Sequence, residues 1–185
     1  QSFDKMPTNA AVLYDTIMDT TLQETTPWPA TRRLWRAKFQ KSRDWFIESE
    51  QERRTLAKPA RIEAKGKREL PNGFTLSAKA DRIDIDAAGN VLIYDYKSGK
   101  KATEKQIRQF SVQLPLEGLI AESGGFDDIA AAKVRRLQLI YLGGEGDTIT
   151  FDETDEAMEN AWKNLCELIS RYQLPTTGYP ARLRP

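Results

Sequence analysis

The chain has no histidine among its 185 residues and only one cysteine, Cys166. A single cysteine excludes an intramolecular disulfide and any metal or iron–sulfur site built from cysteines. Apolar residues flank Cys166 at helical spacing, so we expect a buried structural thiol in a reducing, cytoplasmic environment. No apolar run approaches the ~18 residues of a membrane-spanning helix, and no stretch has a signal-peptide pattern. The sequence therefore predicts neither a disulfide framework nor a membrane partner.

An excess of charge of one sign is also missing, because 28 lysines and arginines nearly balance 27 aspartates and glutamates. The net charge of +1 argues against a broad basic footprint for nucleic acid. Basic residues nevertheless form two clusters. The first lies on a predicted helix and is expected to face solvent or another domain. Its members are Arg32, Arg33, Arg36, Lys38, Lys41 and Arg43. The second is a candidate for contact with a phosphate backbone. Its members, after Lys97, are Lys100, Lys101, Lys105 and Arg108.

Two strand-like segments with turn residues between them predict a β-hairpin. Residues 74–86 alternate in polarity, and residues 91–97 are rich in β-branched and aromatic types. The four residues 87–90 have turn chemistry. A loop of three or four residues brings Asp81 opposite Asp95 or one residue away from it.

The register of this hairpin determines where its charged residues point. A three-residue loop places Asp81 directly opposite Asp95, roughly 5 Å apart at Cβ and on the same face. Lys97 lies two residues beyond Asp95 and shares that face. The residues of opposite parity, expected on a solvated outer face near the turn, are Arg82, Asp84 and Asp86.

Asp81 and Asp95 are thus opposed on a half-buried face, where two carboxylates repel each other unless a cation or a proton lies between them. Carboxylate oxygens suit Mg²⁺, which commonly takes one or two protein carboxylates and fills its shell with water and substrate phosphate. An ammonium such as that of Lys97 can hold a phosphate oxygen or help a water molecule lose its proton. The three residues indicate metal-assisted phosphodiester hydrolysis. The alternative is ordinary solvation of residue types that are common at strand ends.

Three short motifs resemble one known family. They are Ala80-Asp81-Arg82-Ile83-Asp84, Asp95-Tyr96-Lys97-Ser98-Gly99 and, after a spacer, Gln113-Leu114-Pro115-Leu116-Glu117. Together they resemble the nuclease domain of AddB/RecB-type helicase-nucleases, within the PD-(D/E)XK superfamily. The last motif and the later Gly124-Gly125-Phe126 are most similar to the AddB branch from proteobacteria. The resemblance runs from about Trp28 to the C-terminus, and its specific part is residues 77–125.

This resemblance implies a role for each matching residue. Asp81 and Asp95 would be metal ligands, Lys97 the catalytic lysine, and Gln113 the glutamine that the family places on the helix after the lysine. It also implies Mg²⁺, with Mn²⁺ as a substitute, and an exonuclease that acts on DNA in double-strand break repair and recombination. The implied setting is the nucleoid-associated cytoplasm, with a partner subunit of AddA type. The chain departs from the family by lacking the tyrosine of a Gln-x-x-x-Tyr pattern.

A larger departure concerns the histidine metal ligand that relatives carry on an upstream helix. The helix-like segment 8–24 offers Asp15, Asp19 and Glu24 as substitutes, but none lies in the Gly-x-x-x-His-like context of the family. We therefore expect that the ligand helix precedes Gln1 and that the chain is one domain excised from a larger polypeptide. The isolated chain is then expected to show little nuclease activity.

The remaining patterns predict an α/β (α+β) fold with a central mixed β-sheet flanked by helices and a restriction-endonuclease-like core. Helices are expected over residues 31–56 and 155–172. A third helix is expected to begin at a capping box at Thr103 and to kink at Pro115. Further strands are expected over 60–65, 134–142 and 147–151. Four aromatic residues of the first of these helices are expected in the core, namely Trp35, Phe39, Trp45 and Phe46.

The sequence is thus interpreted as a single Mg²⁺-dependent deoxyribonuclease domain. Its parts are a helical lead-in (1–58), a sheet core with the active-site hairpin and helix (59–151), and a C-terminal helix and tail (152–185). No P-loop is visible, so helicase work would belong to other parts of a larger protein. Two alternatives remain, a catalytically inactive nuclease fold used for DNA guiding or subunit docking, and a phosphohydrolase of small substrates. The Asp-Asp-Lys set favours catalysis over the first, and the basic run after Lys97 favours a polymer over the second.

Overall fold

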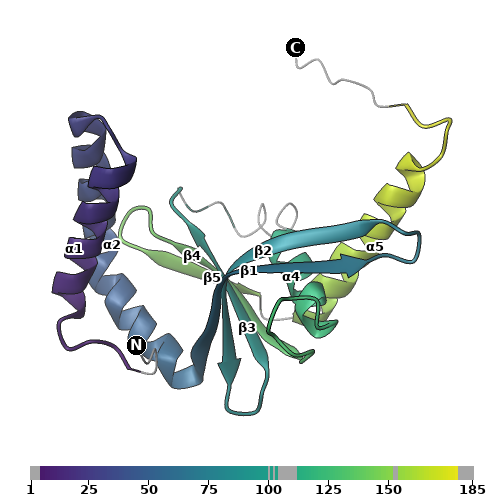
Figure 1. Ribbon diagram of the computed structural model, residues 1–185, viewed down its shortest axis with the longest axis horizontal. Coiled ribbons are helices and arrows are strands. Elements are labelled where there is room, and N and C mark those ends of the chain that lie inside the picture. Colours follow the sequence, from purple (N-terminus) through teal and green to yellow (C-terminus); the bar gives the residue numbers. More distant parts are fainter. Residues whose placement is uncertain (1–4, 100, 102, 104–111, 152–153, 179–185) are drawn as a thin grey trace.

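A five-stranded mixed sheet organises the chain in a computed structural model, which describes residues 5–99, 101, 103, 112–151 and 154–178 (Figure 1). The strand order is β1-β2-β3-β4-β5, and only β3 and β4 run parallel. The predicted α/β class with a mixed sheet flanked by helices is confirmed. The described strands are β1 (Ala57–Glu69), β2 (Thr75–Asp86), β3 (Val91–Lys97), β4 (Val134–Tyr141) and β5 (Asp147–Phe151). The described helices are α1 (Ala10–Thr25), α2 (Pro29–Leu56), α4 (Gln113–Glu122) and α5 (Thr154–Tyr172).

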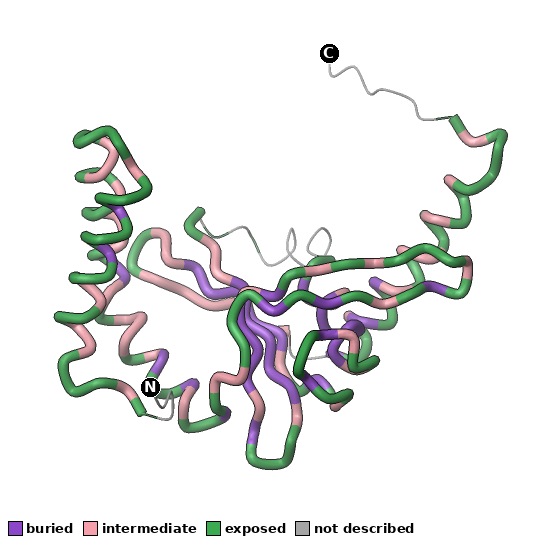
Figure 2. The backbone as a smooth tube through the Cα atoms, viewed as in Figure 1, coloured by how far each residue is buried: buried purple, intermediate pink, exposed green. Residues whose placement is uncertain are grey.

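Helices cover both faces of the sheet. On one face, α4 and α5 bury the main core, in which Ile83 and Ile93 of the hairpin meet Leu137 of β4, Ile120 of α4 and Met158 of α5. On the other face, α2 covers a smaller cluster. Its members include Leu92, Tyr94, Ile140 and the packed ring of Trp45. Burial is therefore concentrated along the central strands, between the helices on either side, as Figure 2 shows. Each fully buried aliphatic side chain contributes roughly 1.5–3 kcal/mol.

The central hairpin has the shorter of the two predicted loops. The β2–β3 ladder pairs Ile83 with Ile93 and Ile85 with Val91, and the Asp86 N–H donates to the Asn90 carbonyl. Three residues remain in the loop, and the last of them, Gly89, has a φ of 85°. A glycine in the left-handed region is typical of three-residue hairpins. The predicted register of the three-residue loop is thereby confirmed as far as the pair of Arg82 with Tyr94, where the ladder ends.

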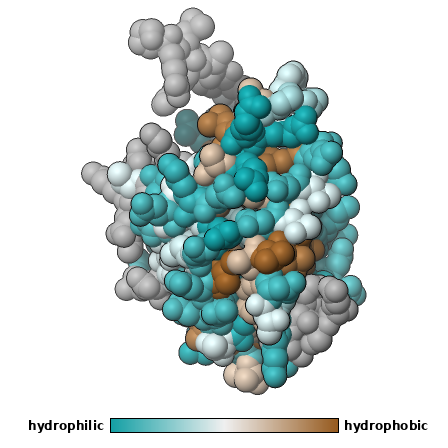
Figure 3. All heavy atoms as spheres, turned by 90° about the vertical axis from the view of Figure 1, so that its left-hand side faces the viewer, coloured by the Kyte–Doolittle hydropathy of each residue, from teal (hydrophilic) through white to brown (hydrophobic). Residues whose placement is uncertain are grey.

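The long helix α2 carries α1 along its outer side (Figure 1). Two ion pairs join the helices, Arg36 with Asp19 and Arg43 with Asp15. Figure 3 shows this side of the molecule, which is largely hydrophilic with separate apolar patches. Asp15 and Asp19, which were considered as possible substitute metal ligands, thus take part in the packing of α1 on α2. The basic cluster of α2 likewise contributes partners to α1 rather than only a solvated face.

A second correction concerns the residues predicted on a solvated outer face. Arg82 and Asp84 are buried beneath α2, and Asp84 is completely inaccessible. Asp86 is also buried, and it organises the turn, since Oδ1 accepts the N–H groups of Ala88 and Asn90. Hydrogen bonds from Asn90 lower the pKa of Asp86 to about 2. Alternation correctly placed Arg82 and Asp84 on the same face of β2, but α2 covers this face, which was expected to meet solvent.

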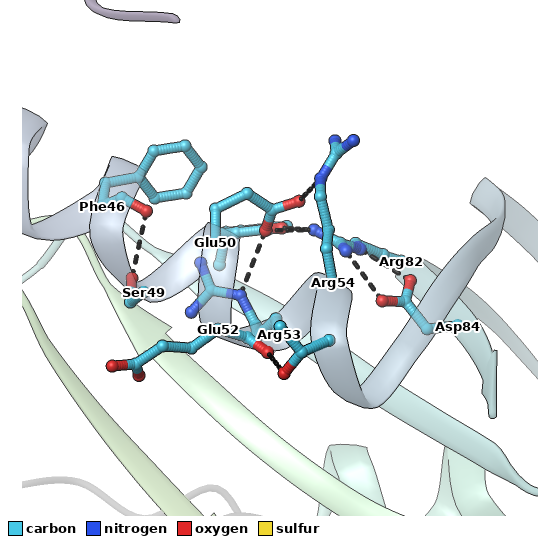
Figure 4. A network of polar contacts seen from close by, with 10 residues as sticks. Phe46, Ser49, Glu50, Glu52, Arg53, Arg54, Arg82 and Asp84 are labelled. Atoms are coloured by element: carbon cyan, nitrogen blue, oxygen red, sulfur yellow. Dashed lines mark hydrogen bonds and ion pairs between the residues drawn. The ribbon is translucent and has the colours of Figure 1, made fainter. Parts of the chain in front are cut away.

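The buried face holds a network of charged residues between α2 and β2 (Figure 4). Arg82 donates two hydrogen bonds of 2.7 Å to the carboxylate of Asp84 and one of 2.7 Å to Glu50. Arg53 and Arg54 also donate to Glu50, at 3.1 and 2.7 Å. Buried charges are tolerated only when paired in this way. The network therefore fixes α2 on the back of the hairpin.

Several smaller expectations differ from the structure. Cys166 is half-buried rather than fully buried, because it lies beside the packed stripe of α5. The aromatic residues of α2 are also half-buried, with Trp35 stacked on Phe39. Pro115 lies in the first turn of α4, where a missing N–H costs little, so no kink is needed within the described part of that helix. The predicted helix start at 104–111 lies outside the described residues. No described helix is long and apolar enough to cross a membrane.

Candidate active site

The candidate site lies where β2 and β3 separate. Their ladder ends at Arg82 and Tyr94, so Asp81 and Asp95 follow the last pair. The Tyr96 N–H donates to Asp81 Oδ2 at 2.8 Å. In a continued ladder this N–H would donate to the backbone of the neighbouring strand, so the carboxylate takes the place of a ladder acceptor. Asp81 is thereby held against β3 at the fork between the two strands.

A bend in β2 accompanies this separation. Ala80 and Ile83 pack into the same core cluster although they differ in parity, so the buried face of β2 changes between them. On the edge strand, Glu63 lies between the pairs to Ala80 and Arg82 and has a φ of 56°. A left-handed conformation costs roughly 1–2 kcal/mol in a residue with a side chain. Such local strain often accompanies functional sites. The side chain of Glu63 itself pairs with Lys79.

Asp95 is the buried carboxylate of the site, with 2% of its surface exposed. Its Oδ1 accepts a 2.9 Å hydrogen bond from Gln113 Nε2, and its Oδ2 forms a 2.6 Å ion pair with Lys97 Nζ. Burial raises the pKa of Asp95 above its ordinary value, and the charge of Asp81 adds to this effect, while Lys97 opposes it. Lys97 therefore supplies the cation that two neighbouring carboxylates require.

Gln113 begins α4 and joins the strands to that helix. Its Nε2 also donates to Glu117 Oε1 at 3.0 Å, and its Oε1 accepts from Lys97 Nζ at 3.4 Å. One amide therefore contacts Asp95, Lys97 and Glu117. The structure thus brings together all four residues proposed for the site, Asp81, Asp95, Lys97 and Gln113.

Glu117 is the member of this cluster that sequence reasoning missed. It is 1% exposed, and its Oε2 has no hydrogen-bond partner among the described residues. Burial raises its pKa to about 7, and the charges of Asp95 and Asp81 contribute. The available signal was the spacing, since a residue four positions after Gln113 lies on the same helix face. Glu117 occupies the position at which the Gln-x-x-x-Tyr pattern has its tyrosine.

The pKa of Glu117 predicts a dependence of stability on pH. Because the folded pKa of about 7 exceeds the ordinary value of 4.5, the folded state holds this proton more tightly than the unfolded state. The stabilisation is complete below about pH 4.5 and is lost as the pH rises through 7. The expected loss is ~3 kcal/mol between pH 4.5 and 8. Urea unfolding without metal should show this slope in the wild type and a smaller slope in Glu117→Gln. Equal slopes would contradict the assignment.

The ligands available for a metal are few. Among the described residues, no group of three or more histidine, cysteine or acidic side chains is arranged to hold a metal ion. The amide of Gln113 stands between the carboxyl groups of Asp95 and Glu117. Asp81 and Asp95 alone suit a cation that binds one or two carboxylates and otherwise water and phosphate, as Mg²⁺ does. The Oδ2 of Asp95, held only by an ion pair, is a suitable donor.

The basic residues proposed for the phosphate backbone are only partly placed. Lys101 is exposed and forms a 2.7 Å ion pair with Asp147 at the start of β5. Lys100, Lys105 and Arg108 lie outside the described residues. The contact with a nucleic-acid backbone therefore stays a prediction.

The comparison with a known family agrees with this fold. A family model described as the PD-(D/E)XK nuclease superfamily matches residues 3–181, so the chain belongs to this superfamily. Members of the superfamily are typically nucleases and usually use divalent metals.

Similar curated proteins include uncharacterised proteins from Rickettsia. The chain is 30% identical over 139 residues to one from Rickettsia typhi, which covers 71% of this chain and 15% of that protein. It is 32% identical over 119 residues to one from Rickettsia conorii, covering 62% and 13% of the two chains. The chain therefore spans only a small part of the length of the relatives it matches.

Proposed function

We propose that the chain is a Mg²⁺-dependent deoxyribonuclease domain of the AddB/RecB type, which hydrolyses phosphodiester bonds. The observation that carries the proposal is the convergence of Asp81, Asp95, Lys97 and Gln113 at the fork between β2 and β3. The membership of the superfamily supports the reaction class. Work in double-strand break repair and recombination, exonuclease action and an AddA-type partner rest on the resemblance of the motifs alone.

Asp81 and Asp95 would hold the cation in this proposal, with Mn²⁺ able to replace Mg²⁺. Bound there, the metal lowers the pKa of a water molecule and polarises a phosphoryl oxygen. Asp81 is already oriented by the Tyr96 N–H, and Asp95 by the amide of Gln113. Such outer contacts orient ligands before a cation arrives.

Lys97 would serve the phosphate. Its side chain is 40% exposed, so its ammonium reaches both the buried Asp95 and solvent. With a cation on Asp95, the ammonium of Lys97 would be free to hold a phosphate oxygen, where charge develops during hydrolysis. DNA is the proposed substrate, and the cytoplasm near the nucleoid is the proposed location.

A cleavage assay tests the proposal. End-labelled linear duplex and single-stranded DNA are incubated in Mg²⁺ with the 185-residue chain and with a longer protein that extends upstream of Gln1, and EDTA is the control. We expect cleavage by the longer protein and weaker cleavage by the short chain, with early release of end label if the enzyme is an exonuclease. If the longer protein binds DNA but never cuts it, the rival proposal of a non-catalytic DNA-guiding domain is favoured. The absence of three suitable metal donors among the described residues is the observation behind that rival.

Lys97→Met is expected to lower cleavage by about 100-fold, because a charge-stabilising contact worth ~3 kcal/mol is lost. Binding of Mn²⁺, followed by calorimetry, should persist or tighten, since the ammonium at 2.6 Å from Asp95 Oδ2 no longer competes with the cation. Lys133→Met is the matched control, as Lys133 forms an exposed pair with Asp155. A collapse of metal affinity in the Lys97 variant would show that the lysine does not act on the phosphate.

A further inference from the structure

Glu117 is buried in a way that a purely structural role does not explain. Its carboxyl group is 1% exposed, one oxygen accepts from Gln113, and the other has no partner among the described residues. Burying a carboxyl group with an unpartnered oxygen is costly. An apolar residue would fill the same place on α4 more cheaply. The polar group is therefore retained for what it does to Gln113.

The amide of Gln113 has three contacts, and they differ in permanence. Two of them involve Asp95 and Lys97, the residues that would serve the cation and the phosphate in the proposed reaction. The third involves Glu117, which is one helical turn away on α4 and belongs to neither group. If the ion pair between Lys97 and Asp95 Oδ2 opened, Glu117 would remain the contact that ties the Gln113 amide to its own helix, beside the hydrogen bond to Asp95 Oδ1.

We propose that Glu117 is a positioning residue that fixes the carboxamide of Gln113, so that its N–H orients Asp95 and its oxygen guides Lys97. This inference rests on the proposed hydrolytic function. Glu117 does not touch the reacting atoms in this arrangement. Because Glu117 lies on α4, it would hold the Gln113 amide independently of the side chains of Asp95 and Lys97 on β3.

The role requires an acceptor and no charge. Because the pKa of Glu117 is raised to about 7 by burial, a large fraction of the group is neutral near neutral pH. A neutral carboxyl group still accepts through its carbonyl oxygen. Glutamine offers the same acceptor at the same length, whereas leucine has similar bulk and no acceptor. This pair of substitutions separates the hydrogen bond from packing.

The test compares Glu117→Gln and Glu117→Leu in the longer protein. Glu122→Gln is the control, because Glu122 ends the same helix and accepts from the Val134 backbone away from the site. We expect Glu117→Leu to lower kcat at least 30-fold, with KM and Mn²⁺ affinity within 3-fold of wild type. Glu117→Gln should stay within 3-fold in all three. Equal loss in both variants, or full activity of Glu117→Leu, would overturn the proposal.

A second measurement does not depend on cleavage. In ¹⁵N-labelled 185-residue protein, the side-chain amide protons of Gln113 should exchange with solvent at least 10-fold more slowly than a free glutamine amide. Glu117→Gln should keep this protection, and Glu117→Leu, or Glu117→Met if the leucine variant does not fold, should lose it. Protection that survives without the acceptor would refute the positioning role. An inactive wild type with the expected amide behaviour would instead refute the proposed hydrolysis alone.

Discussion

Replacing Asp95 with asparagine is expected to lower Mg²⁺-dependent DNA cleavage by about 10³-fold or more. The metal contributes several kcal/mol of transition-state stabilisation, and each ~1.4 kcal/mol changes the rate tenfold. An amide at this position binds a hard cation poorly and cannot pair with Lys97. The fold should persist without metal, since the substitution removes a buried carboxylate whose pKa is already raised by burial.

The measurement is single-turnover cleavage of labelled DNA together with thermal unfolding in EDTA. Asp155→Asn is the matched control, because this exposed aspartate pairs with Lys133 away from the site. Asp81→Ala should give a similar loss of cleavage. Rates near those of the wild type in either variant would remove that residue from the site. Unfolding of both variants would assign the carboxylates a structural role instead.

Replacing Arg82 with methionine is expected to destabilise the fold by about 3–5 kcal/mol, the largest effect on stability that we predict. The guanidinium holds Asp84 through two hydrogen bonds and Glu50 through a third, and all three groups are buried. Its loss leaves carboxylates in the interior between α2 and β2. The stability of Arg82→Lys should lie between those of the wild type and Arg82→Met, because an ammonium cannot form the bidentate contact with Asp84.

Urea unfolding measures this effect, and Arg36→Met is the control, since Arg36 forms an exposed pair with Asp19. Arg36→Met should change the urea midpoint of unfolding very little, because an exposed ion pair contributes little to stability. The Arg82 variants should also weaken cleavage, because Arg82 adjoins Asp81 in the chain and donates to the Tyr96 hydroxyl at 3.2 Å. If Arg82→Met and Arg36→Met unfold at the same urea concentration, the buried network does not fix α2 on the sheet.

The candidate site was largely predictable because it depends on local rules. A three-residue loop with a glycine in the left-handed region sets a register that brings Asp81 and Asp95 just beyond the last pair, and strand alternation adds Lys97. Gln113 was found through the resemblance of its motif. The class of fold followed from the order of strands and helices.

The remaining features depend on contacts between distant segments. Alternation gives the parity of Arg82 and Asp84, but it cannot show that α2, some 30 residues earlier, covers their face. The place of Glu117 beside Asp95 likewise requires the docking of α4 on the sheet. The partners of Asp15 become evident only when α1 packs on α2. In each case the surroundings of a charged residue depend on the packing of an element that is distant in the sequence.

The most direct test of the central claim is a crystal of the protein soaked in Mn²⁺ and examined by anomalous scattering. The account predicts a peak between Asp81 and Asp95, within coordination distance of an oxygen of each. It also predicts that Lys97 Nζ moves away from Asp95 Oδ2, with which it is paired at 2.6 Å without metal. A Mn²⁺ peak elsewhere, or none at a concentration that supports cleavage, with the Lys97–Asp95 pair unchanged, would contradict the account.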